Sequence, residues 1–315
     1  MKILFVFSGN TSGTNRKTGQ DIAILKNPRH QGDSLIEMGY DVDFYQITGK
    51  GFCGYIKNIP KIRRAIKKGK YDIIHAHYSY SAIAASLAGT HRMVVSLMGS
   101  DTFSSPLMLM IIRLFCLFRW KRIIVKTDAM AARIRSRKVT VLPNGVNMDL
   151  FRPIDRSEAR KALSLPDKKI VLFPADPARP EKNFKLASDA FNRLGREDTI
   201  LLPVHDVPHH LIPYYMNSAD VLLLTSLWEG SVNAVKEALA CNLKVVSTDV
   251  GDVRRNIAGL SGCYITSSDA DDIAEKLNEA LDNKIRTRGA ERILEMGLDS
   301  ASINKRLTAL YSSVI

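Results

Sequence analysis

Along the first half of the chain, short apolar runs rich in β-branched residues recur between amphipathic stretches. Continuous runs of this kind are typical of strands that are buried on both faces of a sheet. The predicted strands are Ile3–Phe7, Val42–Tyr45, Ile73–His75, Met93–Leu97, Ile123–Lys126 and Val139–Leu142. The clearest helix between them begins at Asn27 and Pro28 and ends at Gly39, because these residue types suit the two ends of a helix. Alternating strands and helices predict a doubly wound parallel sheet.

The second half of the chain repeats this alternation. Its predicted strands are Ile170–Phe173, Ile200–Val204, Val221–Leu224, Val245–Ser247 and Cys263–Ile265. Its predicted helices are Asn183–Leu194, Pro208–Met216, Ser231–Ala240 and Asp269–Leu281. Pro143, Gly145 and Pro153 interrupt the pattern and place a domain boundary near residue 152. We therefore expect two α/β domains, residues 1–152 and 153–300, facing across a cleft lined by the carboxyl ends of their strands.

Length and composition fit this two-domain organisation. A chain of 315 residues exceeds one ordinary core, and 45% hydrophobic with 24% charged residues is typical of a globular protein. The charge is unevenly divided: residues 1–150 carry 23 Lys and Arg against 9 Asp and Glu, whereas residues 151–315 carry 22 against 23. A one-sided positive charge favours an anionic partner, such as phospholipid headgroups, a diphosphate-linked acceptor or nucleic acid. A solvated basic face without a partner is the alternative.

The spacing of the cysteines and the lengths of the apolar segments indicate the cellular compartment. The four cysteines lie far apart, without a neighbouring histidine or a C-x-x-C pair: Cys53, Cys116, Cys241 and Cys263. This spacing supports neither a disulfide framework nor a zinc site, so we expect no metal and a reducing, cytoplasmic compartment. The apolar run Ile3–Phe7 is too short for a signal peptide. Four Arg and Lys residues interrupt the apolar segment 106–125, which is not expected to span a membrane.

Two glutamates flank the start of the predicted helix Ser231–Ala240. Glu229 precedes Gly230, and Glu237 lies about two turns along, roughly 12 Å away by helical rise. Free amides at a helix N-terminus bind phosphate, and the helix dipole adds to the attraction. A nucleoside diphosphate sugar would fit this span, with the sugar at Glu229, the phosphates at the amides and the ribose at Glu237. An acidic first turn followed by a surface glutamate is the alternative.

Several motifs occur in a fixed order around this segment. The pattern E-G-x6-E-A-x-A over residues 229–240 is followed by V-V-S-T-D-V-G at 245–251. Before it come Y-D-I-I-H-A-H at 71–77, G-S-D at 99–101, V-L-P-N-G-V-N-M-D-L-F at 141–151, R-P-E-K-N at 179–183 and S-A-D-V at 218–221. Together they resemble the family-four retaining glycosyltransferases of the GT-B fold, which have two Rossmann-like domains. The resemblance spans almost the whole chain.

The resemblance implies a role for each matched residue. Glu229 would act at the reacting centre of the donor sugar, and Glu237 would hold the ribose. His77 would reach a sugar hydroxyl, with a buried structural histidine as the alternative. Lys182 and Arg179 would hold the diphosphate leaving group, whose negative charge grows as it departs. Further donor contacts would come from Gly13, Gly99, Asp101, Asn144, Gly230, Ser231, Val232 and Asn233. No metal or organic cofactor is implied.

Two further segments are assigned roles from their positions in the expected fold. The loop Ser8–Thr14 follows the first strand and contains Gly9 and Gly13, and glycine allows a backbone to approach a phosphate closely. The loop matches neither a Walker A motif nor G-x-G-x-x-G, so its place in the fold is what favours a donor contact. The resemblance also implies that residues 301–315 form a helix that returns to the N-terminal domain.

The chain departs from the family pattern at three places. Met98 stands where many relatives have histidine before G-S-D, so a side chain expected at the donor sugar is missing. Asp176 and Pro177 occupy the spacing of the usual Gly-Arg pair, and Arg179 follows two positions later. The passage over residues 194–208 is shorter than usual, which leaves the nucleobase open.

The N-terminal domain, which receives the acceptor in this family, carries the surplus positive charge. Residues 57–70 predict a basic helix with Ile59, Ile62 and Ile66 at helical spacing, and residues 107–120 mix large apolar residues with arginine. Basic amphipathic helices lie on anionic membrane surfaces. We therefore expect a peripheral enzyme on the inner face of the plasma membrane, with a glycan or lipid-linked acceptor. The alternative is that the three isoleucines face the core.

The predicted function is transfer of a sugar from a nucleoside diphosphate sugar in surface polysaccharide or glycolipid synthesis. A sugar-nucleotide epimerase is one alternative. A catalytically silent, glycosyltransferase-like binding protein is another, because of Met98. A nucleic-acid-binding module is motivated only by the basic half, and no RNA-binding signature or aromatic-interleaved basic run accompanies it. We therefore expect no nucleic acid partner.

Overall fold

The computed structural model describes residues 1–8, 12–14, 21–23, 26–49, 51–89, 92–103 and 105–315. Contacts divide the chain into unit 1, residues 1–145 with 300–315, and unit 2, residues 146–299. The break falls between Gly145 and Val146, a few residues before the expected boundary near residue 152. Val146 belongs to unit 2 because its backbone pairs with that of Asp299.

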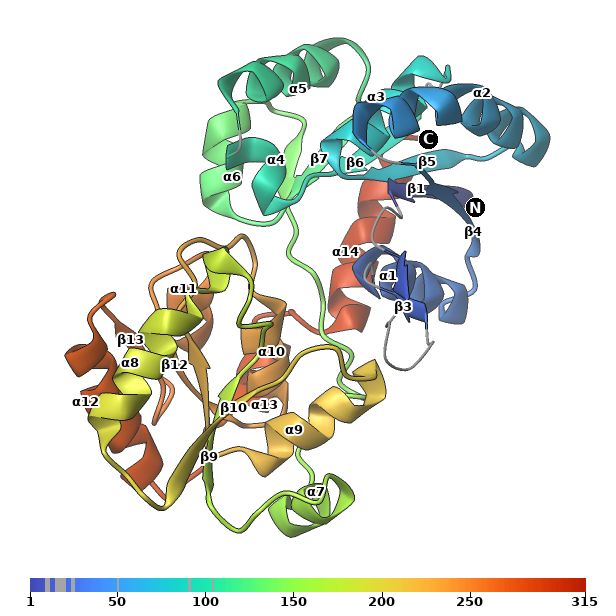
Figure 1. The fold of residues 1–315 in the computed structure, drawn as a ribbon. Coiled ribbons are helices and arrows are strands. Elements are labelled where there is room, and N and C mark those ends of the chain that lie inside the picture. The colour runs from blue at the N-terminus through green and yellow to red at the C-terminus, as the bar shows by residue number, and fades with distance from the viewer. Residues whose placement is uncertain (9–11, 15–20, 24–25, 50, 90–91, 104) are drawn as a thin grey trace. The chain divides into compact units, whose positions relative to one another are not determined.

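Unit 1 is built on a parallel sheet with the strand order β4-β1-β5-β6-β7-β8 (Figure 1). Its strands are β1 (Lys2–Ser8), β4 (Asp41–Ile47), β5 (Ile73–His77), β6 (Met93–Ser96), β7 (Arg122–Val125) and β8 (Val139–Val141). The six strands predicted from the sequence are confirmed. Leu4 and Val6 face one core cluster and Ile3 and Phe5 face the other, so both faces of the sheet are buried.

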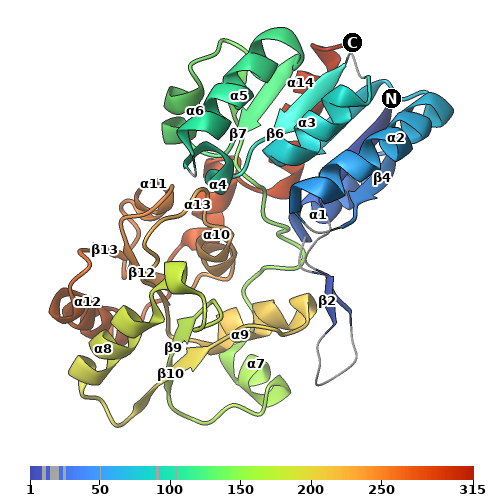
Figure 2. The same ribbon diagram turned by 45° about the horizontal axis from the view of Figure 1, so that its top comes forward.

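Helices cover the two faces of this sheet unequally. One face is covered by α2 (Gly51–Gly69), α3 (Ser79–Leu87), α5 (Pro106–Phe118) and α6 (Asp128–Ile134). The other face is covered by α1 (Lys26–Glu37) and α14 (Ser300–Ser312), and the short helix α4 (Gly99–Phe103) follows β6. In Figures 1 and 2, α3 lies between α2 and α5. We call α2, α3 and α5 the unit 1 helix layer.

Two expectations for unit 1 need correction. The basic helix begins at Gly51 rather than Lys57, and the three isoleucines singled out in the sequence pack in the core: Ile62 is fully buried, and Ile59 and Ile66 pack against the same cluster. The alternative for these three residues is therefore confirmed. In the loop expected over residues 8–14, residues 12–14 form the strand β2 (Ser12–Thr14), which pairs with β3 (Asp21–Ala23). Residues 9–11 lie outside the described part of the chain.

Unit 2 is built on a second parallel sheet with the order β10-β9-β11-β12-β13. Its strands are β9 (Lys169–Phe173), β10 (Thr199–Pro203), β11 (Val221–Leu224), β12 (Lys244–Thr248) and β13 (Tyr264–Thr266). One face packs against α8 (Phe184–Leu194) and α12 (Ala270–Asp282). The other packs against α9 (Ile212–Ser218), α10 (Asn233–Ala240), α11 (Val253–Ile257) and α13 (Gly289–Glu295). The remaining elements are α7 (Arg156–Ala162), η1 (Pro180–Lys182) and η2 (His209–Leu211).

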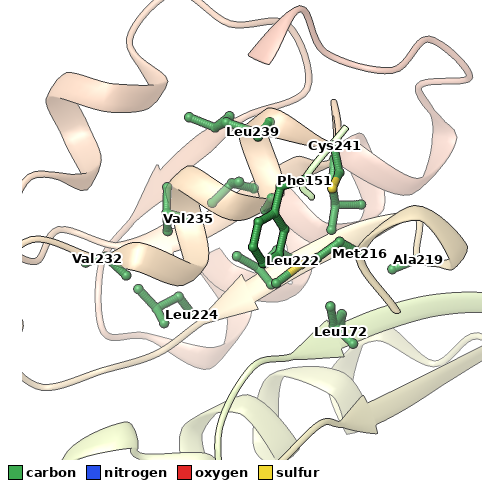
Figure 3. Close-up of a cluster of buried hydrophobic side chains, with 14 of the residues drawn as sticks. Phe151, Leu172, Met216, Ala219, Leu222, Leu224, Val232, Val235, Leu239 and Cys241 are labelled. Atoms are coloured by element: carbon green, nitrogen blue, oxygen red, sulfur yellow. The ribbon is translucent and has the colours of Figure 1, made fainter. Parts of the chain in front are cut away.

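The core on the α9 and α10 side is centred on an aromatic residue from outside the sheet. Figure 3 shows Phe151 among Met216 of α9, Leu222 of β11 and Leu239 of α10. Phe151 ends the motif at 141–151, so burial of this side chain explains why that motif closes with a large apolar residue. The side chain fixes the chain where it enters unit 2.

Within the described residues, no helix combines the length and apolar character needed to cross a bilayer.

Candidate functional site

The loops that follow β9 and β11 are bonded together at the carboxyl edge of the unit 2 sheet. The Thr225 hydroxyl donates to the carbonyls of Lys182 and Asn183 at 3.1 and 3.0 Å. The Leu227 amide donates to the Glu181 carbonyl at 2.9 Å. Asn183 has a φ of 52°, a left-handed conformation that asparagine tolerates better than most residues. These bonds bring the R-P-E-K-N motif next to the segment that begins the double-glutamate motif.

Lys182 and Glu229 form an ion pair within this loop cluster. The Lys182 Nζ lies 2.5 Å from Glu229 Oε1, and the Ser226 hydroxyl donates to the same oxygen at 2.9 Å. The two side chains are only 16% and 17% exposed, so water screens the pair weakly. A cation and a carboxylate, 47 residues apart in sequence, are thus held in one place.

The Arg179 side chain pairs with Glu181. Its Nε donates to Glu181 Oε1 at 2.8 Å, and its side chain is 56% exposed. The pKa of Glu181 is held below its ordinary value by a hydrogen bond from the backbone of Glu181 itself and by the Arg179 guanidinium. The structure therefore places Arg179 on the same loop as Lys182 but pairs it with a neighbouring carboxylate.

A carboxylate from the next strand occupies the start of α10. Asp252, which follows β12, accepts from the Val232 amide at 2.9 Å and from the Ser231 hydroxyl at 2.7 Å. We expected the helix to begin at Ser231 with free amides; instead α10 begins at Asn233, and Asp252 has taken the Val232 amide. The position of Asp252 directly after V-V-S-T-D-V-G was the available signal for this contact.

Lys236 is connected to this carboxylate through Ser231, and the sequence analysis did not single it out. Its side chain is fully buried, and its Nζ donates to the Ser231 hydroxyl at 2.9 Å. Burial lowers the pKa of Lys236 to about 8, while the charges of Asp252 and Glu237 act in the opposite direction. Glu237 itself is half-buried on α10, one turn beyond Asn233.

Gly230 and Gly251 bring two backbones into close contact below Glu229. Gly251 has a φ of 58°, and a Cβ placed there would lie 2.0 Å from the Gly230 carbonyl oxygen. Only glycine fits both the conformation and the space. The loop after β12 thus supports the segment that carries Glu229.

In unit 1, His77 lies inside the domain at the end of β5. Its ring centroid is 4.2 Å from that of His75 and 4.9 Å from that of Phe5. Burial, and secondarily the charge of Lys126, lowers the pKa of His77 to about 3, so the ring is neutral at pH 7. Its Nε2 is buried and has no hydrogen-bond partner among the described residues. His75, by contrast, bonds the Tyr311 hydroxyl at 2.6 Å and the Ser96 hydroxyl.

Asp101 of the G-S-D motif joins the ends of two strands. Its carboxylate accepts from the Ser79 amide at 2.9 Å and from the Met98 amide at 2.5 Å. The side chain is almost fully buried, and this burial raises the pKa of Asp101 to about 6. Met98, which replaces the histidine of many relatives, therefore contributes its backbone to this junction.

The other predicted donor contacts are spread over unit 1. Gly99 begins α4, and Asn144 is half-buried after β8. Gly13 pairs with Ile22 in the β2–β3 hairpin. Among the described residues, no three His, Cys, Asp or Glu side chains are grouped as metal ligands.

Family models match both units of the chain. Residues 13–128 match the family described as Glycosyl transferase 4-like, and residues 204–283 match Glycosyl transferases group 1. The D-inositol 3-phosphate glycosyltransferase of Stackebrandtia nassauensis is 24% identical, and the match covers 72% of this chain and 64% of that protein. The UDP-Gal:alpha-D-GlcNAc-diphosphoundecaprenol alpha-1,3-galactosyltransferase of Escherichia coli is also 24% identical, with 87% and 86% covered. The chain spans 61–65% of the length of the D-inositol 3-phosphate glycosyltransferases that it matches.

Solved structures share the fold at low sequence identity. Sucrose-phosphate synthase from Thermosynechococcus elongatus aligns with a TM-score of 0.82 at 16% identity, covering 100% of this chain and 99% of that one. Anabaena HepE in complex with UDP aligns with a TM-score of 0.72 at 19% identity, covering 99% and 100%. These likenesses confirm the predicted GT-B fold.

Proposed function

We propose that this chain, which belongs to the glycosyltransferases, moves a sugar from a nucleoside diphosphate sugar to a glycan or lipid-linked acceptor. The observation that carries the proposal is the ion pair between Lys182 and Glu229 at the ends of neighbouring strands of unit 2. A donor of this kind presents a neutral sugar next to a doubly charged diphosphate. A fixed carboxylate beside a fixed cation can recognise both parts.

The chemistry assigns a different task to each member of the pair. When the bond from the sugar to the diphosphate breaks, negative charge accumulates on the departing oxygen. A cation already held in place stabilises that charge without reorganising, and we assign this task to Lys182. Glu229 would accept hydrogen bonds from the hydroxyls of the donor sugar at the reacting centre. Arg179 would add its fork to the phosphates once it leaves Glu181.

The remaining donor contacts are proposed from their places in the fold. Glu237 would accept the two ribose hydroxyls. The segment Gly230 to Asn233 would present backbone amides to the phosphates, with Asp252 limiting which amides are available. Gly13, Gly99, Asp101, Asn144 and the buried His77 would act from unit 1, with Asp101 shaping the strand ends through its two backbone bonds.

The acceptor and the pathway are proposed on narrower support. The E. coli relative is named for a diphosphoundecaprenol acceptor, and unit 1 of this chain carries the surplus basic charge that suits a diphosphate-linked lipid. We therefore propose a role in surface polysaccharide or glycolipid synthesis. Retention of anomeric configuration is proposed from the motif resemblance.

A thermal-shift screen tests donor binding directly. Because Anabaena HepE was solved with UDP and with UDP-glucose, uridine nucleotides are the first ligands to try, followed by GDP, ADP and their sugars. A ligand at one hundred times its Kd stabilises the folded state by about 2.7 kcal/mol. Failure of every nucleoside diphosphate to raise Tm would contradict the proposal.

A matched pair of lysine variants locates the site. Lys182→Ala should abolish the shift, because it removes the cation that faces the diphosphate. Lys185→Ala should leave it unchanged, since Lys185 is exposed on α8 and pairs with Asp189. Glu237→Ala should remove the part of the affinity that depends on the ribose. Isomerised nucleotide sugar without an acceptor would point to an epimerase, and binding without turnover would point to a silent binding protein.

A further inference from the structure

The unit 1 helix layer is free of acidic residues. None of its three helices, each described in full, contains an aspartate or a glutamate. α2 alone supplies six basic residues, Lys57, Lys61, Arg63, Arg64, Lys67 and Lys68. Asp72 and Asp101 are the only acidic residues between positions 44 and 127. Asp101 is buried, and Asp72 accepts a bond from the Lys2 amide. The fourth helix on this sheet face, α6, begins with the exposed Asp128. Within α2, α3 and α5 the positive charge has no acidic compensation.

One helix of the layer also exposes a continuous apolar stripe. Its members are spaced at three, four, three and one residues, which places them on one side of a helix. They are 50–74% exposed and comprise Leu107, Met110, Leu114, Leu117 and Phe118 of α5. Ile112 and Cys116 on the opposite side are buried in the core. The core thus uses one side of α5 and leaves the other uncovered.

Basic side chains border this stripe. Arg113 lies beside it on α5, and Arg119 and Lys121 follow the end of the helix; all three are exposed. On α2, Phe52 and Ile56 add exposed apolar surface, whereas Ile59, Ile62 and Ile66 are packed. An apolar stripe with basic neighbours and no acid is the composition of a helix that lies in a lipid interface.

We propose that α5 docks this chain on an anionic lipid surface, with its apolar stripe between the headgroups and the basic residues of α2 and α5 at the phosphates. A second copy of the chain fits poorly, because two acid-free basic layers would repel each other. Anionic lipid supplies the missing negative charge. The inference deepens the proposed function, since it rests on a lipid-linked acceptor being presented at such a surface.

Vesicle co-sedimentation provides the test. The wild-type protein should sediment with phosphatidylglycerol and phosphatidylcholine vesicles, less with phosphatidylcholine alone, and progressively less as salt rises. The variant L114E/L117E should bind the anionic vesicles at least about tenfold more weakly, because each change removes an exposed leucine that would enter the lipid and adds a charge that the phosphates repel. Lys61→Ala and Arg64→Ala should each weaken binding about fivefold.

The matched control makes the same chemical change outside the stripe. I285E/L294E alters two unit 2 residues that are 72% and 57% exposed, and it should bind vesicles as the wild type does. Equal loss in both double variants would overturn the proposal. So would full binding by L114E/L117E, absence of wild-type binding, or binding that ignores lipid charge. Self-association that L114E/L117E abolishes, without vesicle binding, would overturn it in favour of a second copy.

The same preparations separate this inference from the proposed function. A protein that is stabilised by a nucleoside diphosphate but does not bind vesicles refutes the docking surface alone. A protein that binds vesicles but no nucleotide refutes the proposed function and leaves the docking surface supported. L114E/L117E should keep the wild-type nucleotide shift, which also shows that it folds.

Discussion

The helices that cover the two units differ in the charged residues that they carry. On unit 2, α8 and α12 mix both signs: Arg193 pairs with Asp271 at 2.8 Å, and Lys276 pairs with Glu279 at 2.6 Å. On unit 1, the layer of α2, α3 and α5 has no acidic residue. Two sheets of the same architecture are thus covered by surfaces with different electrostatics.

The difference distinguishes charged residues that stabilise the fold by pairing with one another from charged residues that are available to a partner. The ionised groups of unit 2 largely satisfy one another, including the buried carboxylate of Asp220 with Arg156 and Arg160. The basic groups of α2 have no acidic residue within the unit 1 helix layer to pair with, so they attract counter-ions from outside it. Removing the buried, paired charges of unit 2 should therefore affect stability or catalysis, whereas removing surface charges from unit 1 should affect association.

The largest effect is expected at Asp220. Its carboxylate accepts from Arg156 at 2.7 Å, from Arg160 at 3.1 Å and from the Ile170 amide at 2.8 Å. Asp220→Asn should lower the free energy of unfolding by about 3–5 kcal/mol, because it removes the buried charge that pairs with Arg160 and leaves that mostly buried guanidinium with only the exposed Asp167 as a carboxylate partner. Denaturant titration measures this value.

A surface pair provides the control for that prediction. Asp189→Asn breaks an exposed pair with Lys185 on α8 and should change the free energy of unfolding by about 0.5 kcal/mol or less. An equal loss of unfolding free energy in the two variants would show that buried and exposed ion pairs of unit 2 contribute equally to stability.

A large effect on activity is expected at Glu229. Glu229→Gln keeps the shape of the side chain but removes the charge that faces Lys182, so kcat should fall about 10²–10³-fold. The measurement is release of nucleoside diphosphate from the donor identified by thermal shift. Glu275→Gln, on the exposed side of α12, should retain wild-type kcat. Unchanged turnover in Glu229→Gln would remove that residue from the reacting centre.

In unit 1, Asp101 tests a buried carboxylate that accepts hydrogen bonds from the backbone amides of Ser79 and Met98. Burial raises its pKa to about 6, above the value of 3.8 in the unfolded chain. The folded state therefore holds this proton more tightly, and the resulting stability is present below about pH 4 and is lost as pH rises through about 6. The loss amounts to about 3 kcal/mol.

Comparing the wild type with Asp101→Asn isolates the stability that comes from protonation of Asp101. The advantage of the wild type in the free energy of unfolding should shrink between pH 4 and pH 7, as measured by denaturant titration at each pH. A difference that stays flat, or grows with pH, would show that the buried carboxylate is ionised throughout this range.

The smallest effect is expected at Gly251. Gly251→Ala forces a Cβ against the Gly230 carbonyl oxygen and should lower the free energy of unfolding by about 1–3 kcal/mol. Gly259 has a similar positive φ of 74°, but its nearest neighbouring atom is 3.8 Å from the added Cβ. Gly259→Ala should therefore cost less, and an equal cost would assign the effect to backbone conformation alone.

Strands were predictable because they lie in sheets buried on both faces. Such strands need apolar residues at every position, so the run itself marks the element, as at Val221–Leu224. Helix faces were harder. Ile59, Ile62 and Ile66 of α2 have the same spacing as the first three members of the α5 stripe, yet these isoleucines pack in the core and the stripe is exposed. Periodicity identifies a face but not its partner.

The candidate site was predictable in composition but not in its pairings. Glu229 and Lys182 were both identified, but their contact joins loops far apart in sequence. The bonds of Asp252 to the start of α10 likewise depend on tertiary structure, which is why the helix begins two residues later than its sequence suggests. Arg179 pairs with Glu181 because that carboxylate is two residues away.

The return of α14 has a consequence for synthesis. Leu307 and Tyr311 of α14 belong to the core of unit 1, although unit 2 lies between them and the rest of that core in sequence. A ribosome adding about 5–20 residues per second needs roughly 10–30 s to make the intervening segment. Throughout that interval His75 lacks its Tyr311 partner, and the sheet face under α14 stays uncovered. Unit 2, whose residues are contiguous, can complete its fold first.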